Sequence, residues 1–466
     1  MRKEDFFYVR QRFESNIDGI PSAGTTLSSS DQKVPTTVVG SSQPQPSVLA
    51  KPSKSNVFVA GILAVDYSCD HQPRTSTSSA LEMHTSNPAR IGQSLGGVGH
   101  NVARAASLMG SDVRFCSAVG DDLSGKAALA ALSQEGLGSA AVKVMPAEAS
   151  RRTAQYISVN EQNKDLAIAM ADMSILNVPE AGEEDVIQKA FVDLWEPQLT
   201  DSKPTHVVVD ANWPPAYLQK WLAAASTIGA HVTFEPVSNA KSTIPFELPA
   251  VPGQDQVDTL PAFPNPAISL ASPNSYELAA MHTAARERGF FERQDWWEVI
   301  DSLGIPSTGA RVAMAMATSS ELVDQGVPQQ SVQLLPFIPS ICTKLGSKGV
   351  LVTQLLKAGD PRLTSGEYAP YILSRCNNDT ESTLGVGGVY MRLFPPSEQV
   401  DAADIVSVNG VGDTFVGTLV AQLAKAKAQG IEKGVEQCID MAQKAAVLTL
   451  KSAQAVSPEL SALRLK

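Results

Sequence analysis

The stretch with the most suggestive chemistry is Asn409-Gly410-Val411-Gly412-Asp413, near the C-terminal end of the sequence. Its two glycines let the backbone turn sharply, so that successive N–H groups point at one spot. A helix that starts here adds the positive end of its dipole, which suits the turn to an anion such as a phosphate group. A carboxylate at Asp413 could then take a proton from a hydroxyl group that attacks this phosphate.

The residues on either side of this stretch predict a strand, a glycine turn and a helix. Val406 to Val408 form a short apolar segment before the glycines, and apolar residues recur at helical spacing from Phe415 to Leu423. An aspartate at a helix start is also a common cap. Taken alone, the motif therefore leaves both a capped turn and an anion site open.

A second glycine-rich segment, from Gly92 to Asn101, also precedes a predicted helix. Small residues at Gly96 and Gly97 allow a ligand to approach the backbone closely. The Asn101 amide, in the first turn of this helix, offers a donor and an acceptor to sugar hydroxyls. Asp66 follows a predicted buried strand, at the edge where open α/β sheets bind ligands, although a solvated loop aspartate is equally consistent with the sequence.

Strands and helices alternate along most of the chain, which predicts an α/β fold with a doubly wound, mostly parallel sheet flanked by helices. Polar residues follow the predicted strands and would gather at one edge of the sheet. The predicted strands that carry this argument are 57–61, 113–119, 207–209, 232–234 and a short one at Ala271.

One segment departs from this alternation. Residues 154–158 and 166–170 alternate between apolar and polar on either side of a turn-like segment, which predicts a β-hairpin. We expect the segments 66–90 and 151–173 to form a small β lid that excludes water from the site. Tyr156 and Met170 are the lid residues that we expect to face the substrate.

Two further motifs could serve a nucleotide. Asn274 and Glu277 are three residues apart, so on a helix they share a face and could hold a hydrated Mg²⁺ through water. The same pair is also the pattern of a capping box. The segment from Thr343 to Gly349 predicts a strand, a glycine turn and the start of another strand. Its lysines, Lys344 and Lys348, could meet phosphates or could be solvated turn residues.

Composition excludes several classes of partner. The net charge of −11 and the isoelectric point near 5.1 disfavour nucleic acid and anionic membranes. The five cysteines are odd in number and lack the spacing of metal ligands, which indicates a reducing compartment. No apolar run is long enough to cross a bilayer, and the first residues are too polar for a secretory signal. We therefore expect a soluble, cytoplasmic protein.

The domain organisation follows from the same composition. Residues 1–55 are rich in Ser, Thr, Pro and Gln, so we expect a disordered leader or linker, and residues 56–466 are expected to form the folded domain. Two insertions are predicted, one at about 286–339 with Trp296 among its apolar residues, and an irregular one at about 359–396.

Taken together, these motifs resemble the ribokinase-like (PfkB) carbohydrate kinase family in order and spacing, and the resemblance covers nearly everything from Asn56 onward. It rests on Gly96-Gly97 with Asn101, the hairpin, Asn274-x-x-Glu277, Thr343-x-x-Gly346-x-x-Gly349 and Asn409-Gly-Val-Gly-Asp413. Within the family, the chain is most similar to pseudouridine kinases through Ser86-Asn87-Pro88, Asp172-Met173 and Pro236-Val237-Ser238 with Lys241.

The resemblance implies a sheet flanked by helices with a small β lid. It also implies an ATP- and Mg²⁺-dependent kinase that phosphorylates a C-nucleoside at its 5′-hydroxyl. The implied catalytic residues are Asp413 as general base and Gly410, Val411 and Gly412 as anion hole. The implied substrate residues are Asp66, Gly96, Gly97, Asn101 and Tyr156. The implied nucleotide residues are Asn274, Thr343, Gly346 and Gly349, with Glu277 on the magnesium side.

Departures from the family pattern leave several points open. Ser407 stands where many members have an Asp, which leaves a monovalent-cation site open, and Val411 replaces a usual Ala or Ser. A kinase of the same family for another nucleoside or sugar and a catalytically silent scaffold remain alternatives. Further expectations are a homodimer through the lid and a functional link to a pseudouridine-5′-phosphate glycosidase, to which such kinases are often fused.

Overall fold

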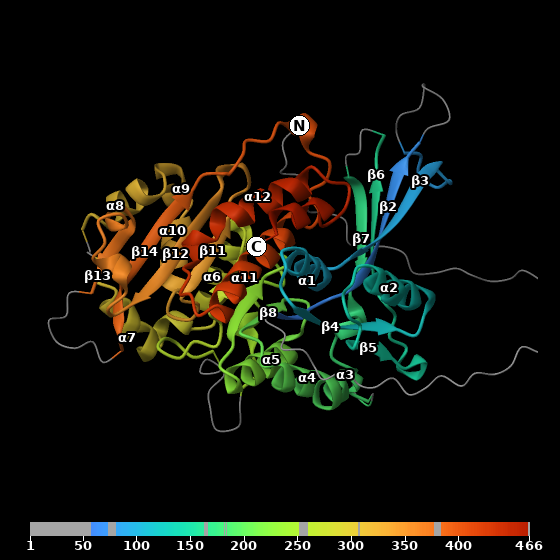
Figure 1. Ribbon diagram of the computed structural model, residues 1–466, viewed down its shortest axis with the longest axis horizontal. Helices are drawn as coiled ribbons and strands as arrows, with labels where there is room; N and C mark the ends of the chain where they lie inside the picture. The colour runs from blue at the N-terminus through green and yellow to red at the C-terminus, as the bar shows by residue number, and fades with distance from the viewer. Residues whose placement is uncertain are drawn as a thin grey trace, which may run out of the picture. The chain divides into compact units, whose positions relative to one another are not determined.

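A ten-stranded sheet forms the centre of the fold (Figure 1). The computed structural model describes residues 57–72, 81–162, 166–180, 182, 184–250, 260–305, 308–376 and 384–464, all within the unit that spans 51–466. The leader predicted at 1–55 lies outside the described residues. In the order in which they pair, the strands are β13 (Ile372–Arg375), β14 (Val386–Phe394), β12 (Val350–Lys357), β11 (Ser340–Lys344), β10 (Leu270–Ala271), β9 (His231–Glu235), β8 (His206–Asp210), β1 (Val57–Ala60), β4 (Val113–Gly120) and β5 (Ala141–Met145).

The direction of pairing confirms the predicted α/β class. Every neighbouring pair from β5 to β11 is parallel, whereas β12, β14 and β13 continue the sheet in antiparallel fashion. The carboxyl ends of the parallel strands therefore share one edge, where such sheets bind ligands.

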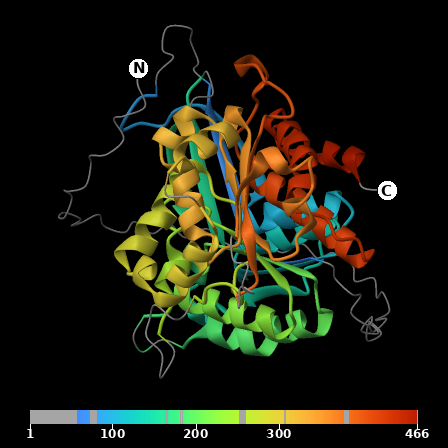
Figure 2. The same cartoon turned by 90° about the vertical axis from the view of Figure 1, so that its left-hand side faces the viewer.

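Helices cover both faces of this sheet. They are α1 (Val98–Leu108), α2 (Leu123–Gln134), α3 (Val186–Ala190), α4 (Glu196–Ser202), α5 (Pro215–Thr227), α6 (Ser275–Glu287), α7 (Gln294–Ser302), α8 (Ala310–Ala317), α9 (Ser320–Asp324), α10 (Val327–Leu334), α11 (Val411–Ala428) and α12 (Ile439–Leu450). Figure 2 shows α11 and α12, in red, on the opposite side of the sheet from the yellow helices α6 to α10. None of the helices in the described ranges is long and apolar enough to cross a membrane.

Successive side chains of β1 point to opposite faces of the sheet, and each face packs into an apolar core. Phe58 packs into one core, which also holds Trp221 of α5. Val57 and Val59 pack into the other core, together with Phe415 of α11. A strand buried on both faces has no polar side, which is why its sequence is a continuous apolar run.

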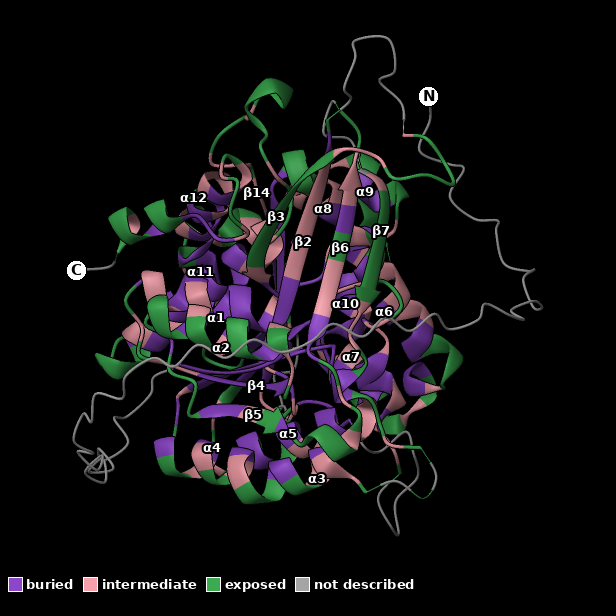
Figure 3. Ribbon diagram, turned by 90° about the vertical axis from the view of Figure 1, so that its right-hand side faces the viewer, coloured by how far each residue is buried: buried purple, intermediate pink, exposed green. Residues whose placement is uncertain are grey.

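A second sheet of four strands stands at the ligand edge, and we call it the lid sheet. Its strands are β3 (Ala89–Gly96), β2 (Ala64–His71), β6 (Ala154–Asn160) and β7 (Leu166–Asp172), in that spatial order. The strands β6 and β7 pair as the predicted hairpin. Figure 3 shows that the two edge strands, β3 and β7, are exposed along most of their length.

Two sequence expectations about secondary structure were wrong. The region 359–396 is not wholly irregular, because β14 is a full strand of the main sheet. The sequence of β14 does not look like a strand because it contains Gly387 and Gly388. The packing requires glycine at position 387, since a Cβ there would clash with the carbonyl group of Lys357 on β12. Val406 to Val408 form no strand, since the N–H groups of Val406 and Ser407 donate to the carbonyl oxygen of Leu450 at the end of α12, at 3.0 and 3.2 Å.

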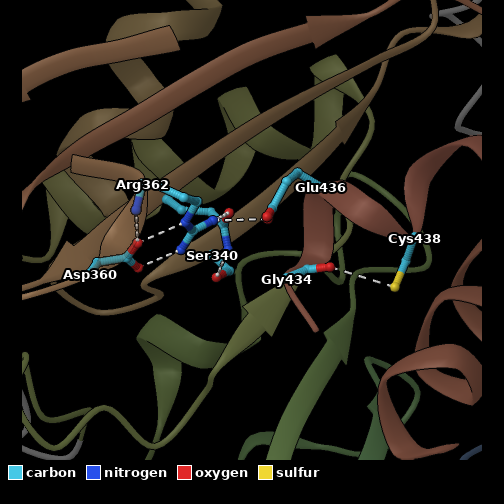
Figure 4. Close-up of polar contacts among 7 residues, drawn as sticks. Ser340, Asp360, Arg362, Gly434, Glu436 and Cys438 are labelled. Carbon is cyan, nitrogen blue, oxygen red and sulfur yellow. Dashed lines mark hydrogen bonds and ion pairs between the residues drawn. The ribbon is translucent and has the colours of Figure 1, made fainter. Parts of the chain in front are cut away.

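A partly buried ion-pair network holds the antiparallel end of the sheet against the connection between α11 and α12 (Figure 4). Arg362 Nη1 donates to Glu436 Oε2 at 2.8 Å and to Gln354 Oε1 at 2.9 Å. Its Nη2 donates to Asp360 Oδ2 at 2.8 Å. Because the guanidinium binds three partners from separate segments, it fixes the turn that precedes α12.

Candidate active site

The candidate site lies where the carboxyl ends of β1, β8, β9 and β11 meet the first turns of α1 and α11. Asn101 and Asp413 come from these two helices. The Asn101 Nδ2 group donates to Asp413 Oδ2 at 2.8 Å. Gly410 is the N-cap residue of α11, and no described side chain caps the helix there. The Asp413 carboxylate thus binds a side chain of another helix instead of serving as the cap residue of its own.

The charge on Asp413 is destabilised by its surroundings. Burial raises the pKa of its carboxyl group from 3.8 to about 6, and the nearby carboxylates of Asp210 and Glu277 act in the same direction. The hydrogen bond from Asn101 and the charge of Lys344 oppose this shift. A carboxylate with a pKa near 6 is a stronger base than an ordinary aspartate and is still mostly ionised at pH 7.

The glycine turn before Asp413 has a shape that only glycine allows. Gly410 has φ 71°, and a Cβ there would clash with the carbonyl oxygen of Ala455. A Cβ on Gly412 would lie 3.2 Å from Lys344 Nζ, so the ammonium group lies directly beside the turn. The N-terminus of α11 and the Lys344 ammonium group therefore lie side by side, an arrangement that favours an anion at this place.

Glu235, which the sequence analysis did not select, holds this lysine in place. It is the last residue of β9, it is buried, and its Oε1 and Oε2 accept hydrogen bonds from Lys344 Nζ at 3.1 and 3.3 Å. Burial raises the pKa of Glu235, and Asp413 and Glu277 add to this shift while Lys344 opposes it. Burial disfavours the charge on Lys344, but Glu235 and Glu277 outweigh it and raise the pKa of Lys344. The sequence signal that could have identified Glu235 is its position as an acidic residue at the end of a buried strand.

The lid sheet brings Asp66 and Tyr156 to the same site. They pair directly across β2 and β6, so their side chains share a face of the sheet. A Cβ at Gly96 would clash with the Asp66 carboxylate, so this glycine makes room for it. Burial raises the pKa of Asp66 to about 6, His100 lowers it, and Asp413 raises it further. The effect of Asp413 on the pKa of Asp66 places the two carboxylates in one electrostatic environment.

Met170 does not join them. It pairs with Ile157, one residue along from Tyr156, and so lies on the opposite face of the lid sheet. Its side chain is 63% exposed. The expectation that Met170 faces the substrate was therefore wrong.

Gly97 serves the packing of the site. It has φ 90° and is the N-cap residue of α1. A Cβ there would lie 2.6 Å from the carbonyl oxygen of Ile62, in the turn between β1 and β2. The close approach of α1 to this turn brings Asn101 near the lid.

Asn274 and Glu277 form the capping box that the sequence analysis kept as an alternative. Asn274 Oδ1 accepts hydrogen bonds from the N–H groups of Tyr276 and Glu277, both at 2.9 Å, and Glu277 Oε2 accepts one from Asn274 N at 2.8 Å. Within the described ranges, no group of three or more His, Cys, Asp or Glu side chains is arranged to hold a metal ion. Glu277 nevertheless lies close enough to influence the pKa values of Asp413 and Lys344. The magnesium role of Glu277 remains a prediction.

The residues predicted to bind the nucleotide differ in burial and do not all lie at the site. Thr343 is fully buried next to Lys344, and its Oγ1 has no partner among the described residues. Gly346 begins an exposed turn, whereas Gly349 packs against β14, where a Cβ would clash with Phe394 O. Lys348 points elsewhere and pairs with Glu321 of α9 at 2.5 Å. Of the two lysines in this segment, Lys344 alone reaches the site.

Comparison with known proteins gives a family match over most of the described chain. Residues 55–288 and 383–462 match the family described as pfkB family carbohydrate kinase. The unmatched stretch between them contains α7 to α10 and β11 to β13. The assignment of Thr343, Lys344 and Gly346 to the site is therefore based on the structure and the sequence motif, because the family match does not include them.

Two curated relatives are informative. The chain is 30% identical over 383 residues to a pseudouridine-metabolizing bifunctional protein of Schizosaccharomyces pombe, an alignment that covers 81% of this chain and 44% of the relative. It is 33% identical over 143 residues to a pseudouridine kinase of Escherichia coli, which covers 30% of this chain and 45% of the relative. In both cases the aligned part spans less than half the length of the relative.

Solved structures share the fold at low identity. The ribokinase of Arabidopsis thaliana, solved with ribose and ATP, aligns with a TM-score of 0.52 at 14% identity and covers 88% of this chain and 98% of its own. The ribokinase of Cryptococcus neoformans, solved with ADP, gives the same TM-score and identity, with 88% and 100% coverage. The likeness establishes a ribokinase-like arrangement of sheet and helices.

Proposed function

Because this chain belongs to the pfkB family of carbohydrate kinases, we propose that it phosphorylates the 5′-hydroxyl of pseudouridine with ATP as phosphoryl donor. The family match supports the coarser statement, an ATP-dependent phosphotransferase that acts on an alcohol group. The two relatives named for pseudouridine support the finer one. The observation that carries the proposal is the Asn101–Asp413 hydrogen bond beside the glycine turn.

Asp413 acts as the general base in this proposal. The hydrogen bond from Asn101 occupies Oδ2 and orients the carboxylate, so that Oδ1 can take the proton from the attacking 5′-hydroxyl. As this proton leaves, the hydroxyl oxygen attacks the terminal phosphorus of ATP, and the bond from that phosphorus to the bridging oxygen of ADP breaks. The raised pKa of Asp413 increases the driving force for the first transfer.

The turn from Gly410 through Val411 to Gly412 forms the anion hole. Its N–H groups, the α11 N-terminus and Lys344 stabilise the charge that spreads over the oxygens of the transferred phosphoryl group. Glu235 keeps Lys344 at this position. Phosphoryl transfer depends mostly on such positioning and charge stabilisation.

The sugar binds between the main sheet and the lid. Asp66, with room made by Gly96, is placed to accept hydrogen bonds from sugar hydroxyls, and Tyr156 lies next to it. Asn101 is buried, and its Oδ1 lacks a partner among the described residues, which leaves an acceptor for another hydroxyl. Closure of the lid sheet over the sugar would exclude water and so prevent hydrolysis of ATP.

The nucleotide side has groups that fit its phosphates. The buried Thr343 Oγ1 needs a partner, and Lys344 and the exposed turn at Gly346 adjoin it. Carboxylate oxygens are the protein ligands that Mg²⁺ prefers, and Glu277, with Asn274 beside it, would hold the hydrated ion through water. When bound, Mg²⁺ supplies charge neutralisation of the phosphate oxygens.

Two partner relationships belong to this proposal. The product would be the substrate of a pseudouridine-5′-phosphate glycosidase, and the fission yeast relative carries the name of a bifunctional pseudouridine-metabolizing protein. We also propose that lid sheets of two copies pair, because Ile91, Ile168 and Met170 expose apolar side chains on the face that points away from Asp66.

The experiment that tests the proposed function is ATP consumption across pseudouridine, uridine, adenosine, ribose and fructose. The expected result is the highest kcat/KM with pseudouridine. A clear preference for another nucleoside or for a free sugar would replace the substrate and leave the kinase chemistry in place. No consumption with any acceptor would favour the catalytically silent scaffold.

A further inference from the structure

A polar cluster that the mechanism above does not use lies at the carboxyl ends of β8 and β9. Lys241 Nζ donates to Asn212 Oδ1 at 2.6 Å. The Asn212 and Ile62 N–H groups donate to the two carboxylate oxygens of the buried Asp210, both at 2.9 Å. Asn212 is only 8% exposed, and its Nδ2 makes no hydrogen bond of normal geometry to a described residue, although the Asn212 side chain lies close enough to Asp210 to lower the pKa of that carboxyl group. Buried amide groups normally find partners, so this one points to a ligand.

The turn that presents Lys241 is strained. Val237 has φ 66°, and the Ser238 N–H donates to the carbonyl oxygen of Pro236 at 2.7 Å. A hydrogen bond between residues i and i+2 around a central residue with positive φ is a rare form of γ-turn. A β-branched residue such as Val rarely adopts this conformation, and such strain tends to occur at functional sites. After this turn, Lys241 N donates to Ser238 O at 3.1 Å, and the side chain of Lys241 returns to Asn212.

The cluster adjoins the sugar side of the candidate site. Asp210 is close enough to Asp413 to raise the pKa of that carboxyl group. Ile62, which donates to Asp210, lies in the turn that leads from β1 into β2, the strand that carries Asp66. The carbonyl oxygen of Ile62 also accepts a hydrogen bond from His100 N, at the start of α1.

The chemistry of the cluster selects its ligand. Nδ2 of Asn212 and the ammonium of Lys241 are donors only, so the bound atom must be an acceptor. The charge of Lys241 is balanced by Asp210, which opposes the lowering of the Lys241 pKa by burial. A cluster without net charge suits a neutral oxygen better than a phosphate.

We infer that Asn212 and Lys241 form a donor pair that binds an oxygen acceptor of the nucleoside substrate, either a ribose hydroxyl or a carbonyl group of the base. The inference rests on the proposed function, since it assigns a contact within the same substrate site. The strained turn at Val237 positions Lys241 for this contact.

The test compares Lys241→Met and Asn212→Leu with the unchanged chain in steady-state kinetics. Each substitution removes the donor and keeps much of the side-chain volume. We expect KM for pseudouridine to rise about 10- to 100-fold, with KM for ATP unchanged and kcat reduced less than threefold. Lys189→Met, at an exposed lysine of α3, is the matched control and should leave both KM values unchanged. Melting temperatures of all variants identify any loss of folding, and Lys241→Arg should restore part of the affinity.

Ribose as second acceptor separates the two sources of the oxygen. An equal rise in KM for ribose and for pseudouridine would show that the donor pair binds a ribose hydroxyl. A rise in KM for pseudouridine alone would show that it binds a carbonyl group of the base. An unchanged KM for pseudouridine in both folded variants, or a rise in KM for ATP instead, overturns the donor pair. Calorimetric measurement of pseudouridine binding without ATP separates the donor pair from the proposed kinase function. Weaker binding to the variants than to the unchanged chain supports the donor pair even if no turnover is found. An absence of binding to the unchanged chain overturns the donor pair.

Discussion

Asn101 and Asp413 are 312 residues apart in the sequence, and the Asn101 Nδ2 group donates to Asp413 Oδ2 at 2.8 Å. The two residues lie in the first turns of α1 and α11, which pack against each other on one face of the sheet. This contact joins a candidate sugar-binding residue to the candidate base. In the proposed mechanism, it couples the position of the acceptor to the proton that has to leave it.

Substitution of Asn101 by Ala should lower kcat and move the acid limb of the pH profile. The hydrogen bond from Asn101 lowers the pKa of Asp413, so its loss raises that pKa above the present value of about 6. We expect kcat at pH 7 to fall about 10- to 100-fold, since the carboxylate loses both its orientation and part of its ionised fraction. A pH profile of kcat/KM checks this. An unchanged acid limb would show that the hydrogen bond does not influence the base.

The unchanged chain should lose activity in acid near pH 6. Burial raises the pKa values of Asp413 and Asp66 to about 6, and both groups act in their ionised form. As the pH falls through 6, each carboxylate takes up a proton, so kcat/KM should drop by more than tenfold per pH unit well below this value. Circular dichroism over the same range controls for unfolding. Full activity at pH 5 would show that neither group has to be ionised.

Gly410 and Gly430 offer a matched pair for the glycine turn. Their φ values are 71° and 70°, but a Cβ at Gly410 would clash with Ala455 O, whereas nothing lies within 4 Å of a Cβ at Gly430. Gly430→Ala should cost only the strain of a positive φ, about 1 kcal/mol. Gly410→Ala should cost more and should also reduce kcat, because the anion hole must shift. Equal melting temperatures and equal kcat values for the two variants would argue against a required shape at Gly410.

Selectivity for pseudouridine over uridine should depend on the inner face of the lid sheet. Pseudouridine has an extra ring N–H, and an acceptor left unpaired by uridine would cost about 1–3 kcal/mol, or about 10- to 100-fold in kcat/KM. Tyr156→Ala should reduce this ratio, because Tyr156 shares a face with Asp66. Met170→Ala, on the outer face, is the control and should not change it. A ratio that responds to Met170 and not to Tyr156 would reverse the assignment of the two faces.

Local patterns in the sequence were sufficient for the parts of the fold that local physics determines. Continuous apolar runs predicted β1, β4, β8 and β9, alternation predicted the hairpin of β6 and β7, and glycine clusters marked the starts of α1 and α11, whereas β5 was not predicted. β14 was missed because Gly387 and Gly388 look like chain breakers. Their need for glycine comes from neighbouring strands, which no local pattern displays.

The candidate site was only partly predictable for a similar reason. Asn101, Asp66 and Asp413 belong to recognisable motifs, but Glu235 and Asn212 have no motif of their own. Their importance arises from distant partners, Lys344 and Lys241. Conversely, Lys348 has the same type and setting as Lys344 in the sequence, and only the direction of its side chain toward Glu321 separates them.

The most direct test of the central claim is the turnover of Asp413→Asn. The new side chain keeps the shape and an oxygen that can accept from Asn101, but it cannot take a proton, so kcat should fall about 10²- to 10⁴-fold. The melting temperature and ATP affinity should stay nearly unchanged. Asp440→Asn, an exposed first-turn aspartate of α12, is the matched control and should keep full activity. A kcat for Asp413→Asn within threefold of the unchanged chain would contradict the assignment of Asp413 as the base.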